Sequence, residues 1–224
     1  MASQVLLVFL ASVFVKAVCG ASLMYPRVIP TPPTLPPHFS ASFVETFSGK
    51  IVNKNNGTWY YDYGNKRARF DHGEGQMNNF CGGQGLSPKD PKAPCSLIFS
   101  PEGNMYVLYR ESMTCCLLCG TEQGCTILRP DWIKKDSKLL YVEKINGDEC
   151  YGYGKKGAVT TYDVLYSDVS GYMCRYHEVV AGITHNLTFN KDSFNWGPQP
   201  DYLFDVPKWC NRICPHPYTP PPQH

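Results

Sequence analysis

Cysteine most constrains how this chain can fold, because its chemistry depends on the compartment that the chain enters. The 224-residue sequence has eleven cysteines, and the first, Cys19, follows an apolar run from Val5 to Val18. This run is too short for a bilayer span of about 20 residues, and the small residues Gly20 and Ala21 follow it. The sequence therefore predicts a secretory signal peptide over residues 1–20, although no Lys or Arg precedes the apolar run.

Removal of that peptide leaves an even set of cysteines, which in an exported chain predicts disulfides and no free thiol. In a reducing compartment the cluster at residues 115–125 would suggest zinc instead, since Cys-x-x-Cys spacing brings two thiolates to one ion. We expect Cys115 and Cys116 to have different partners, because adjacent cysteines bond only with strain. Cys210 and Cys214 should tie the C-terminus to the body, and the other pairings stay open. The predicted disulfide residues are Cys81, Cys95, Cys115, Cys116, Cys119, Cys125, Cys150, Cys174, Cys210 and Cys214.

Composition and length indicate one globular β domain. Hydrophobic residues make up 43% of the sequence, and the formal net charge is only +2, with basic and acidic residues interspersed. We therefore expect no nucleic acid as a partner, and the mature chain has no long apolar stretch that predicts a transmembrane segment. Proline marks an extended lead-in over residues 21–38 and a tail over 211–224, which flank a single domain over 39–210.

Short segments of alternating apolar and polar residues fill that domain, and no helical period exceeds two turns. Gly, Asn, Asp and Pro bound these segments, which is typical of an antiparallel meander. Asn53–Gly57 is predicted as a polar turn and Gly64-Asn65 as the centre of a hairpin, in which Asp62 should pair with an arginine. The expected strands are Phe39–Phe47, Trp59–Tyr63, Arg67–Asp71, Met105–Tyr109, Leu139–Val142, Val159–Tyr166, Tyr172–Glu178 and Ile183–Phe189.

Two sequons mark possible glycans on this framework: Asn56-Gly57-Thr58 and Asn186-Leu187-Thr188. An exported protein carries N-linked glycans at such sites where they are exposed. Asn56 and Asn186 are therefore predicted glycosylation sites, and Asn56 is the better candidate because it lies in the expected turn.

The search for catalytic motifs finds none. The sequence has no Gly-x-Ser-x-Gly elbow, no His-Glu-x-x-His zinc helix, no phosphate-binding glycine loop and no calcium loop. Its six histidines are dispersed, and neighbours such as Asp71 and His72 on one strand point to opposite faces. We therefore expect structural histidines, no catalytic residue, no cofactor and no metal.

Six segments share their order and spacing with one group of known proteins: Trp59–Asp62, Arg67–Asp71, Cys125–Trp132, Asn146–Cys150, Tyr162-Asp163 and Phe204–Cys210. They resemble a family of secreted, largely uncharacterised plant and protist proteins, and the N-terminal non-catalytic domain of counting-factor-associated cysteine proteinases. More distantly, they resemble the ependymin-related glycoproteins. The resemblance runs from about Pro36 to Cys210, and Ile127–Trp132 is its most specific part.

The ependymin resemblance implies a mostly β fold. It would be a strongly curved antiparallel meander sheet folded on itself into a half-barrel, stapled by disulfides and similar to the LolA/LppX-like periplasmic lipoprotein carriers. An apolar pocket would lie between its layers. The meander by itself would equally fit a closed barrel or a sandwich. The chain departs from its relatives in an insert over 80–101 and in the Cys-Cys-x-x-Cys cluster.

These features favour a secreted, non-enzymatic glycoprotein that binds a hydrophobic or lipid-like small molecule. In the strand ending at Tyr166, residues 162, 164 and 166 share one face, opposite Thr161 and Asp163. An extracellular adhesion or matrix module, which would bind another protein, is the alternative, and a secreted hydrolase is a third. The residues expected to line the pocket are Tyr162, Val164, Tyr166, Tyr172 and Tyr176.

The Ile127–Trp132 run is expected to be structural. Pro130 favours an extended residue before it, so a strand should end near Leu128 and turn, with Trp132 buried. The alternative makes Arg129 and Asp131 a polar pair at the rim of the pocket.

Overall fold

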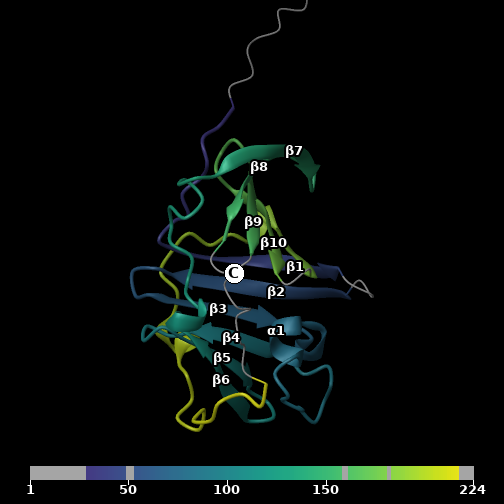
Figure 1. Ribbon diagram of the computed structural model, residues 1–224, viewed down its shortest axis with the longest axis vertical. Coiled ribbons are helices and arrows are strands. Elements are labelled where there is room, and N and C mark those ends of the chain that lie inside the picture. Colours follow the sequence, from purple (N-terminus) through teal and green to yellow (C-terminus); the bar gives the residue numbers. More distant parts are fainter. Residues whose placement is uncertain (1–28, 49–52, 158–160, 181–182, 217–224) are drawn as a thin grey trace, which may run out of the picture.

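The computed structural model describes residues 29–48, 53–157, 161–180 and 183–216. The predicted signal peptide, the start of the lead-in and the end of the tail lie outside these residues, and the domain boundaries remain predictions. Eleven strands form one antiparallel sheet (Figure 1). They are β1 His38–Ser48, β2 Asn53–Asp62, β3 Arg67–His72, β4 Cys95–Phe99, β5 Asn104–Tyr109, β6 Thr114–Gly120, β7 Lys138–Ile145, β8 Asp148–Lys156, β9 Tyr162–Ser167, β10 Met173–Val180 and β11 Ile183–Phe189.

In the residues that the structure describes, helical structure is limited to single turns. The helical segments are α1 Asn79–Gly82 and the 3-10 turns η1 Gly75–Met77, η2 Thr121–Gln123, η3 Lys191–Ser193 and η4 Asp201–Phe204. Within the described ranges, no helix has the length and apolar character needed to cross a membrane.

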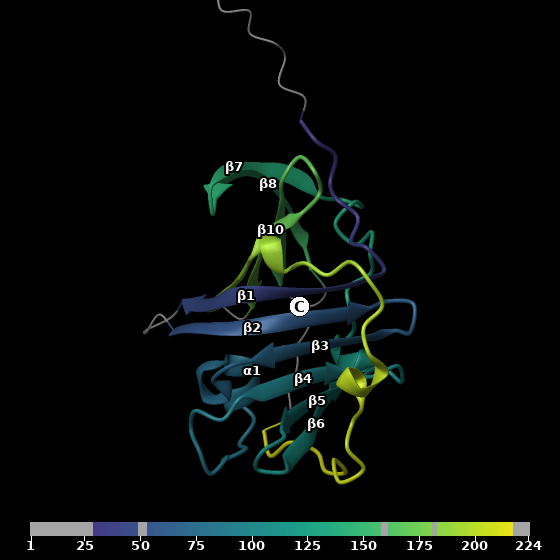
Figure 2. The same ribbon diagram turned by 180° about the vertical axis from the view of Figure 1, so that it is seen from behind.

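The first strand lies in the middle of the sheet, whose order is β6-β5-β4-β3-β2-β1-β11-β10-β9-β8-β7. The chain runs outward from β1 to the edge at β6, crosses to the opposite edge at β7, and returns to β1 through β11. The strands from β8 to β10 lie at a steep angle to the stacked strands from β1 to β6 (Figures 1 and 2). The sheet is therefore a strongly bent, open meander stapled by disulfides, and the predicted fold class is confirmed.

The hairpin expected around Gly64-Asn65 is confirmed, and so is its ion pair. Asp62 and Arg67 are opposite each other in the β2–β3 register, and Arg67 Nε donates to Asp62 Oδ2 over 2.7 Å. The Arg67 guanidinium also lies 4.4 Å from the centre of the Phe204 ring. The pair thus lies across the hairpin, and Arg67 also contacts the segment after β11.

The turn predicted over Asn53–Gly57 is wrong, because these residues form the first half of β2 and pair with β1. Asn55 is buried, and its side chain bonds both the N–H and the C=O of Glu74. A Cβ at Gly57 would collide with the ring of Phe43. The polar and small residues that suggested a turn are therefore needed where strands pack closely.

Three strands were missed, and all three are buried over most of their length. β4 lies inside the expected insert, β6 contains the cysteine cluster, and β8 follows the turn at Asn146-Gly147. Strands that are covered on both faces do not alternate between apolar and polar residues.

Five disulfides are present, and every described cysteine takes part in one. Cys115 and Cys116 have different partners, and Cys210 and Cys214 tie the C-terminal segment to β6, as predicted. The two adjacent cysteines belong to different apolar clusters, because neighbouring residues of a strand face opposite sides. The pairs are Cys81–Cys95, Cys115–Cys210, Cys116–Cys214, Cys119–Cys125 and Cys150–Cys174.

The covering segment, residues 121–137, joins β6 to β7 and packs on the main apolar core. The strand expected to end near Leu128 is wrong, since β6 ends at Gly120 and the chain beyond η2 is irregular. Trp132 is buried as expected, with 8% of its surface exposed, and its ring meets Tyr176 edge to face at 5.8 Å. Arg129 and Asp131 form an exposed ion pair of 3.4 Å.

Replacing Trp132 with Ala should destabilise the fold, because the cavity it leaves cannot collapse. We expect a loss of about 3 to 5 kcal/mol in the free energy of unfolding, and little secreted protein. The measurements are urea unfolding and secretion yield. Trp196→Ala is the matched control, since Trp196 is 42% exposed. Normal secretion and an unchanged melting temperature for Trp132→Ala would contradict the packing role.

Candidate ligand-binding site

A cavity of about 280 Å³ lies between the covering segment and the inner face of the sheet. Its wall is mainly apolar, with a polar end formed by side chains of β9, β10 and β11. A larger hollow of about 1300 Å³ is bordered by outward-facing side chains of β1, β2 and β11. That hollow carries many polar groups, so the smaller cavity is the better site for an apolar ligand. Apolar residues on its wall include Trp59, Ala68, Phe70, Met105, Leu118 and Leu187.

Alternate residues of β2 and β3 build the apolar wall. Trp59 stacks on Phe70, with ring centres 5.0 Å apart, and Tyr61 lies two residues beyond Trp59 on the same face. The Tyr61 hydroxyl donates to the carbonyl of Leu128 over 2.6 Å, which holds the covering segment over the cavity. Burial raises the pKa of Tyr61, so this hydroxyl remains a donor.

A disulfide shapes the near end of the covering segment. Cys119 at the end of β6 bonds Cys125, so the chain makes a tight loop through η2. The loop closes at Gly124, whose φ of 87° suits glycine. Leu35 of the lead-in is buried beside the segment, and its N–H donates to Pro130 O over 2.9 Å.

The polar end of the cavity is a row of three side chains on adjacent strands. Asp163 is opposite Glu178 in the β9–β10 register, and Glu178 is opposite His185 in the β10–β11 register. His185 Nδ1 lies 2.7 Å from Glu178 Oε1. The Tyr176 hydroxyl lies 3.3 Å from Glu178 Oε2 and 3.4 Å from Asp163 Oδ1. All four residues border the cavity.

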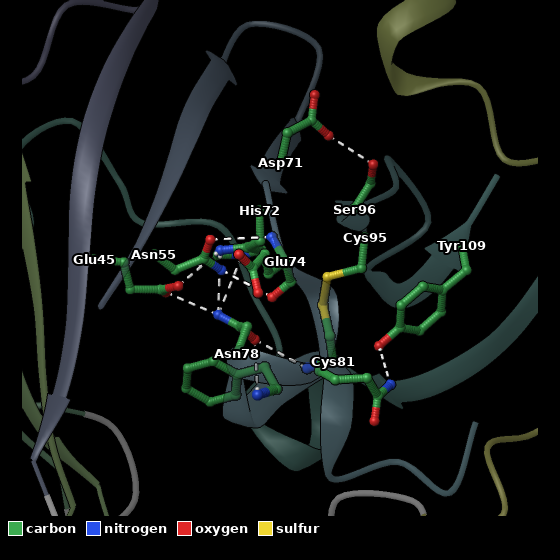
Figure 3. Close-up of a disulfide and its surroundings, with 12 residues drawn as sticks. Glu45, Asn55, Asp71, His72, Glu74, Asn78, Cys81, Cys95, Ser96 and Tyr109 are labelled. Carbon is green, nitrogen blue, oxygen red and sulfur yellow. Dashed lines mark hydrogen bonds and ion pairs between the residues drawn. A yellow bond between two sulfur atoms is a disulfide. The ribbon is translucent and has the colours of Figure 1, made fainter. Parts of the chain in front are cut away.

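Behind this row, the fully buried carboxylate of Glu45 holds three side chains. Its Oε1 lies 2.7 Å from His185 Nε2 and accepts from Asn78 Nδ2 over 2.8 Å, and its Oε2 lies 3.1 Å from His72 Nδ1. Figure 3 shows Asn78 between Glu45 and the start of α1, where its Oδ1 accepts from the N–H groups of Phe80 and Cys81. His72 and His185 are therefore hydrogen-bonded to buried side chains.

The charges of Glu45 and His185 stabilise each other. Burial alone would raise the pKa of Glu45, but hydrogen bonds from His185 and His72 outweigh it and lower the pKa to about 2. Burial would lower the pKa of His185, but its bonds to Glu178 and Glu45 raise the pKa to about 9. At neutral pH His185 is thus a cation between two carboxylates.

The pKa of Asp163 shifts upward, in contrast to that of Glu45. Burial and the negative charge of Glu178 raise its pKa to about 7, against the hydrogen bonds from Tyr176 and Thr161 and the charge of Lys155. Its carboxyl group therefore gains and loses a proton near neutral pH. The polar end of the cavity can bind a proton or a hydrogen-bond donor.

Two residues that line the cavity each have a buried polar atom without a hydrogen-bond partner among the described residues. These atoms are Oε1 of Gln84, an acceptor, and Nε1 of Trp59, a donor. Gln84 is 9% exposed and Trp59 is 2% exposed, so neither atom is freely hydrated. Unpaired buried polar atoms have an energetic cost.

The five residues expected to line a pocket lie in different places. Tyr176 borders the cavity. Tyr162 is exposed at the start of β9, and Val164 and Tyr166 belong to a separate small cluster that includes the Cys150–Cys174 disulfide. Tyr172 packs against Phe194 and Trp196 and borders the outer hollow. The opposite face of β9, with Asp163 and Leu165, is the one directed toward the cavity and the main core.

Only part of the polar row has a signal in the sequence. Alternation along β9 correctly placed Asp163 on the face opposite Tyr162, Val164 and Tyr166. That Asp163 lies beside Glu178 and His185 depends on how the strands pair, which the sequence does not show. The two sequon residues face away from the cavity: Asn56 is exposed on β2, and Asn186 Oδ1 lies 2.8 Å from His177 Nδ1. Among the described residues, no cluster of His, Cys, Asp and Glu could hold a metal ion.

Comparisons with known proteins add little. No protein-family model and no curated protein matches the sequence. Among solved structures, the chain is similar to an uncharacterized conserved protein from Thermus thermophilus, with 10% identity over 78% of this chain and 88% of that one and a TM-score of 0.46. A LolA superfamily protein from Nitrosomonas europaea has 11% identity over 80% and 93% of the two chains, with a TM-score of 0.36.

A third similar structure comes from the Pseudomonas aeruginosa MucA/MucB complex, with 10% identity over 79% of this chain and 58% of that one and a TM-score of 0.37. TM-scores below 0.5 at such identities do not establish a common fold. The architecture described above therefore rests on the strand order of the chain itself.

Asp163→Asn should change how stability depends on pH. The folded chain binds a proton at Asp163 up to pH about 7, whereas the ordinary pKa is 3.8, so this contribution is complete below pH 3.8 and is lost as the pH rises through 7. The difference between these two pKa values corresponds to at most roughly 4 kcal/mol. We expect the melting temperature of Asp163→Asn to fall less than that of the wild type between pH 4 and 8.

Asp131→Asn is the matched control for this measurement, because Asp131 is 60% exposed. Its pH profile should run parallel to that of the wild type. A profile for Asp163→Asn that also runs parallel would show that Asp163 does not titrate with folding in this range.

Proposed function

We propose that this protein is a secreted, non-enzymatic binding protein for a hydrophobic or lipid-like small molecule. The observation that carries the proposal is the cavity of about 280 Å³ with a mainly apolar wall, closed on one side by the covering segment. Small-molecule sites have this character: an apolar surface with a few placed polar groups. The fold expected from the ependymin resemblance, a bent meander with a pocket between its layers, agrees with this role.

The size of the cavity limits the ligand. Small-molecule pockets begin at about 300 Å³, so this cavity suits one short chain or a compact ring system. Burial of about 200 Å² of apolar surface, at roughly 25 cal/mol per Å², would contribute about 5 kcal/mol to binding. A micromolar affinity would need polar contacts in addition.

Secretion and glycosylation are part of the proposal. Five disulfides are typical of proteins that fold in an oxidising compartment, and they accord with the signal peptide predicted over residues 1–20. Glycans at Asn56 and Asn186 would project from the outer face and leave the cavity open. The relationship to counting-factor-associated proteinases and ependymin-related glycoproteins stays a proposal based on the six segments.

Two other functions each have one observation in their favour. Three consecutive apolar residues, Leu140, Tyr141 and Val142, are exposed on the edge strand β7, as an adhesion module would need. Asp163 and Glu178 are paired across β9 and β10, and many hydrolases use two neighbouring carboxylates. A hydrolase would turn over p-nitrophenyl esters or glycosides and lose this activity in Asp163→Asn, whereas a binding protein has no such activity.

The cavity can be tested with the neutral fluorescent probe N-phenyl-1-naphthylamine. We expect saturable binding to the wild type and at least tenfold weaker binding to Ala68→Phe, because Ala68 borders the cavity and the added ring occupies it. Ser170→Phe, at an exposed turn, is the control and should bind normally. Equal probe affinity in all three folded proteins would argue against a ligand cavity, and co-purified lipid in native mass spectra would support one.

The mature protein should begin near Ala21 and contain no free thiol. Secreted protein is alkylated without reduction, and its intact mass is compared before and after. We expect no added alkyl group, because removal of Cys19 leaves the ten cysteines that pair. Two or more alkylated cysteines would be incompatible with this prediction.

A further inference from the structure

Two carboxylates at the polar end of the cavity share one tyrosine hydroxyl. Tyr176 has one hydroxyl proton, yet its oxygen lies within 3.4 Å of an oxygen of Asp163 and of Glu178. At any moment one of these carboxyl oxygens lacks the tyrosine proton. Close to neutral pH the deficit can be met by a proton on Asp163, or by a donor that enters from the cavity.

The neighbouring cations already have hydrogen-bond partners. His185 has two ring nitrogens, and they face Glu178 and Glu45 at 2.7 Å each. Lys155 is opposite Asp163 in the β8–β9 register, but its Nζ donates to the carbonyls of Trp132 and Lys135, at 2.9 Å each. Both ring nitrogens of His185 and two of the three N–H groups of Lys155 are thus directed to these partners.

Gln84 also lines the cavity. Its buried Oε1 has no donor among the described residues. The unpartnered donor, Trp59 Nε1, belongs to an indole that stacks on Phe70 in the apolar wall. A ligand with several N–H groups would satisfy the two carboxylates.

We propose that the cavity binds a cationic amphiphile: a single short alkyl chain or apolar ring system in the apolar part, with a protonated amine donating to Asp163 and Glu178. This inference rests on the proposed function and names its ligand class. An ammonium group carries three donors and the opposite charge, so it meets both requirements of the site. A carboxylate head group would bring a further buried negative charge and more acceptors.

The proposal is tested by displacement of N-phenyl-1-naphthylamine at pH 7.5 with decylamine, 1-decanol and decanoate. These competitors share their chain length and differ in the head group. We expect decylamine to bind at least tenfold more tightly than decanol, and decanoate to bind most weakly. The formal net charge of the protein is +2, so non-specific attraction would favour decanoate instead.

Variants of Asp163 and Glu178 test whether these carboxylates cause the preference for the amine. The ratio of decylamine to decanol affinity is measured within each variant, so that any general loss of binding cancels. We expect this ratio to fall below threefold in Asp163→Asn and in Glu178→Gln. Glu143→Gln is the control, because Glu143 bonds Tyr166 and Arg175 away from the cavity, and it should keep the wild-type ratio.

Proton release is a second readout. Decylamine should displace the proton from Asp163, so its binding heat at pH 7 should depend on the ionisation enthalpy of the buffer, and that of decanol should not. Equal affinities of decylamine and decanol for the wild type, or tightest binding of decanoate, would overturn the cationic class and leave the hydrophobic cavity in place. Failure of the naphthylamine probe to bind would instead contradict the proposed function. If a variant does not fold, the relative affinities of decylamine, decanol and decanoate for the wild type still test the proposal.

Discussion

The carboxylate of Glu45 is the group on which the two halves of the sheet and the polar end of the cavity depend. It is fully buried on the central strand, and its partners come from β3, β11 and the start of α1. A buried charge without partners would destabilise a protein by several kcal/mol, so this arrangement must form as a unit. Since His185 also bonds Glu178, the position of Glu45 sets the position of the carboxylates at the cavity.

The same strands supply both the apolar wall and the polar end of the cavity. On β11, Leu187 faces the apolar part and His185, two residues earlier, faces the polar part. His185 is further fixed by Phe47, whose ring stacks on it at 4.3 Å. The small side chain of Ala68 and the tethered covering segment leave the volume between them unfilled. A ligand would therefore meet a preformed surface, which reduces the entropy lost on binding.

The sequence predicted the elements in which apolar and polar residues alternate, and the three strands that it missed are covered on both faces. β1 and the hairpin at Gly64-Asn65 were found because their residues alternate, whereas β4, β6 and β8 were missed because most of their residues are buried. The same limit affects the site: on β9, Val164 and Asp163 face opposite sides, and both are buried. Alternation separates the two faces, but only the pairing of β9 with β10 shows which face meets Glu178 and the cavity.

The central place of β1 has a consequence for how this chain must fold during synthesis. The hairpins from β1 to β6 can form in order as they emerge, but the other edge of β1 waits for β11, and His185 follows Glu45 by 140 residues. Such distant pairing is slow, and until it occurs the nascent chain presents an unpaired strand edge that favours aggregation. Cys115 and Cys116 must likewise wait for partners 95 and 98 residues later. Closure of these two bridges would therefore mark the last stage of maturation, well after Cys81 has met Cys95.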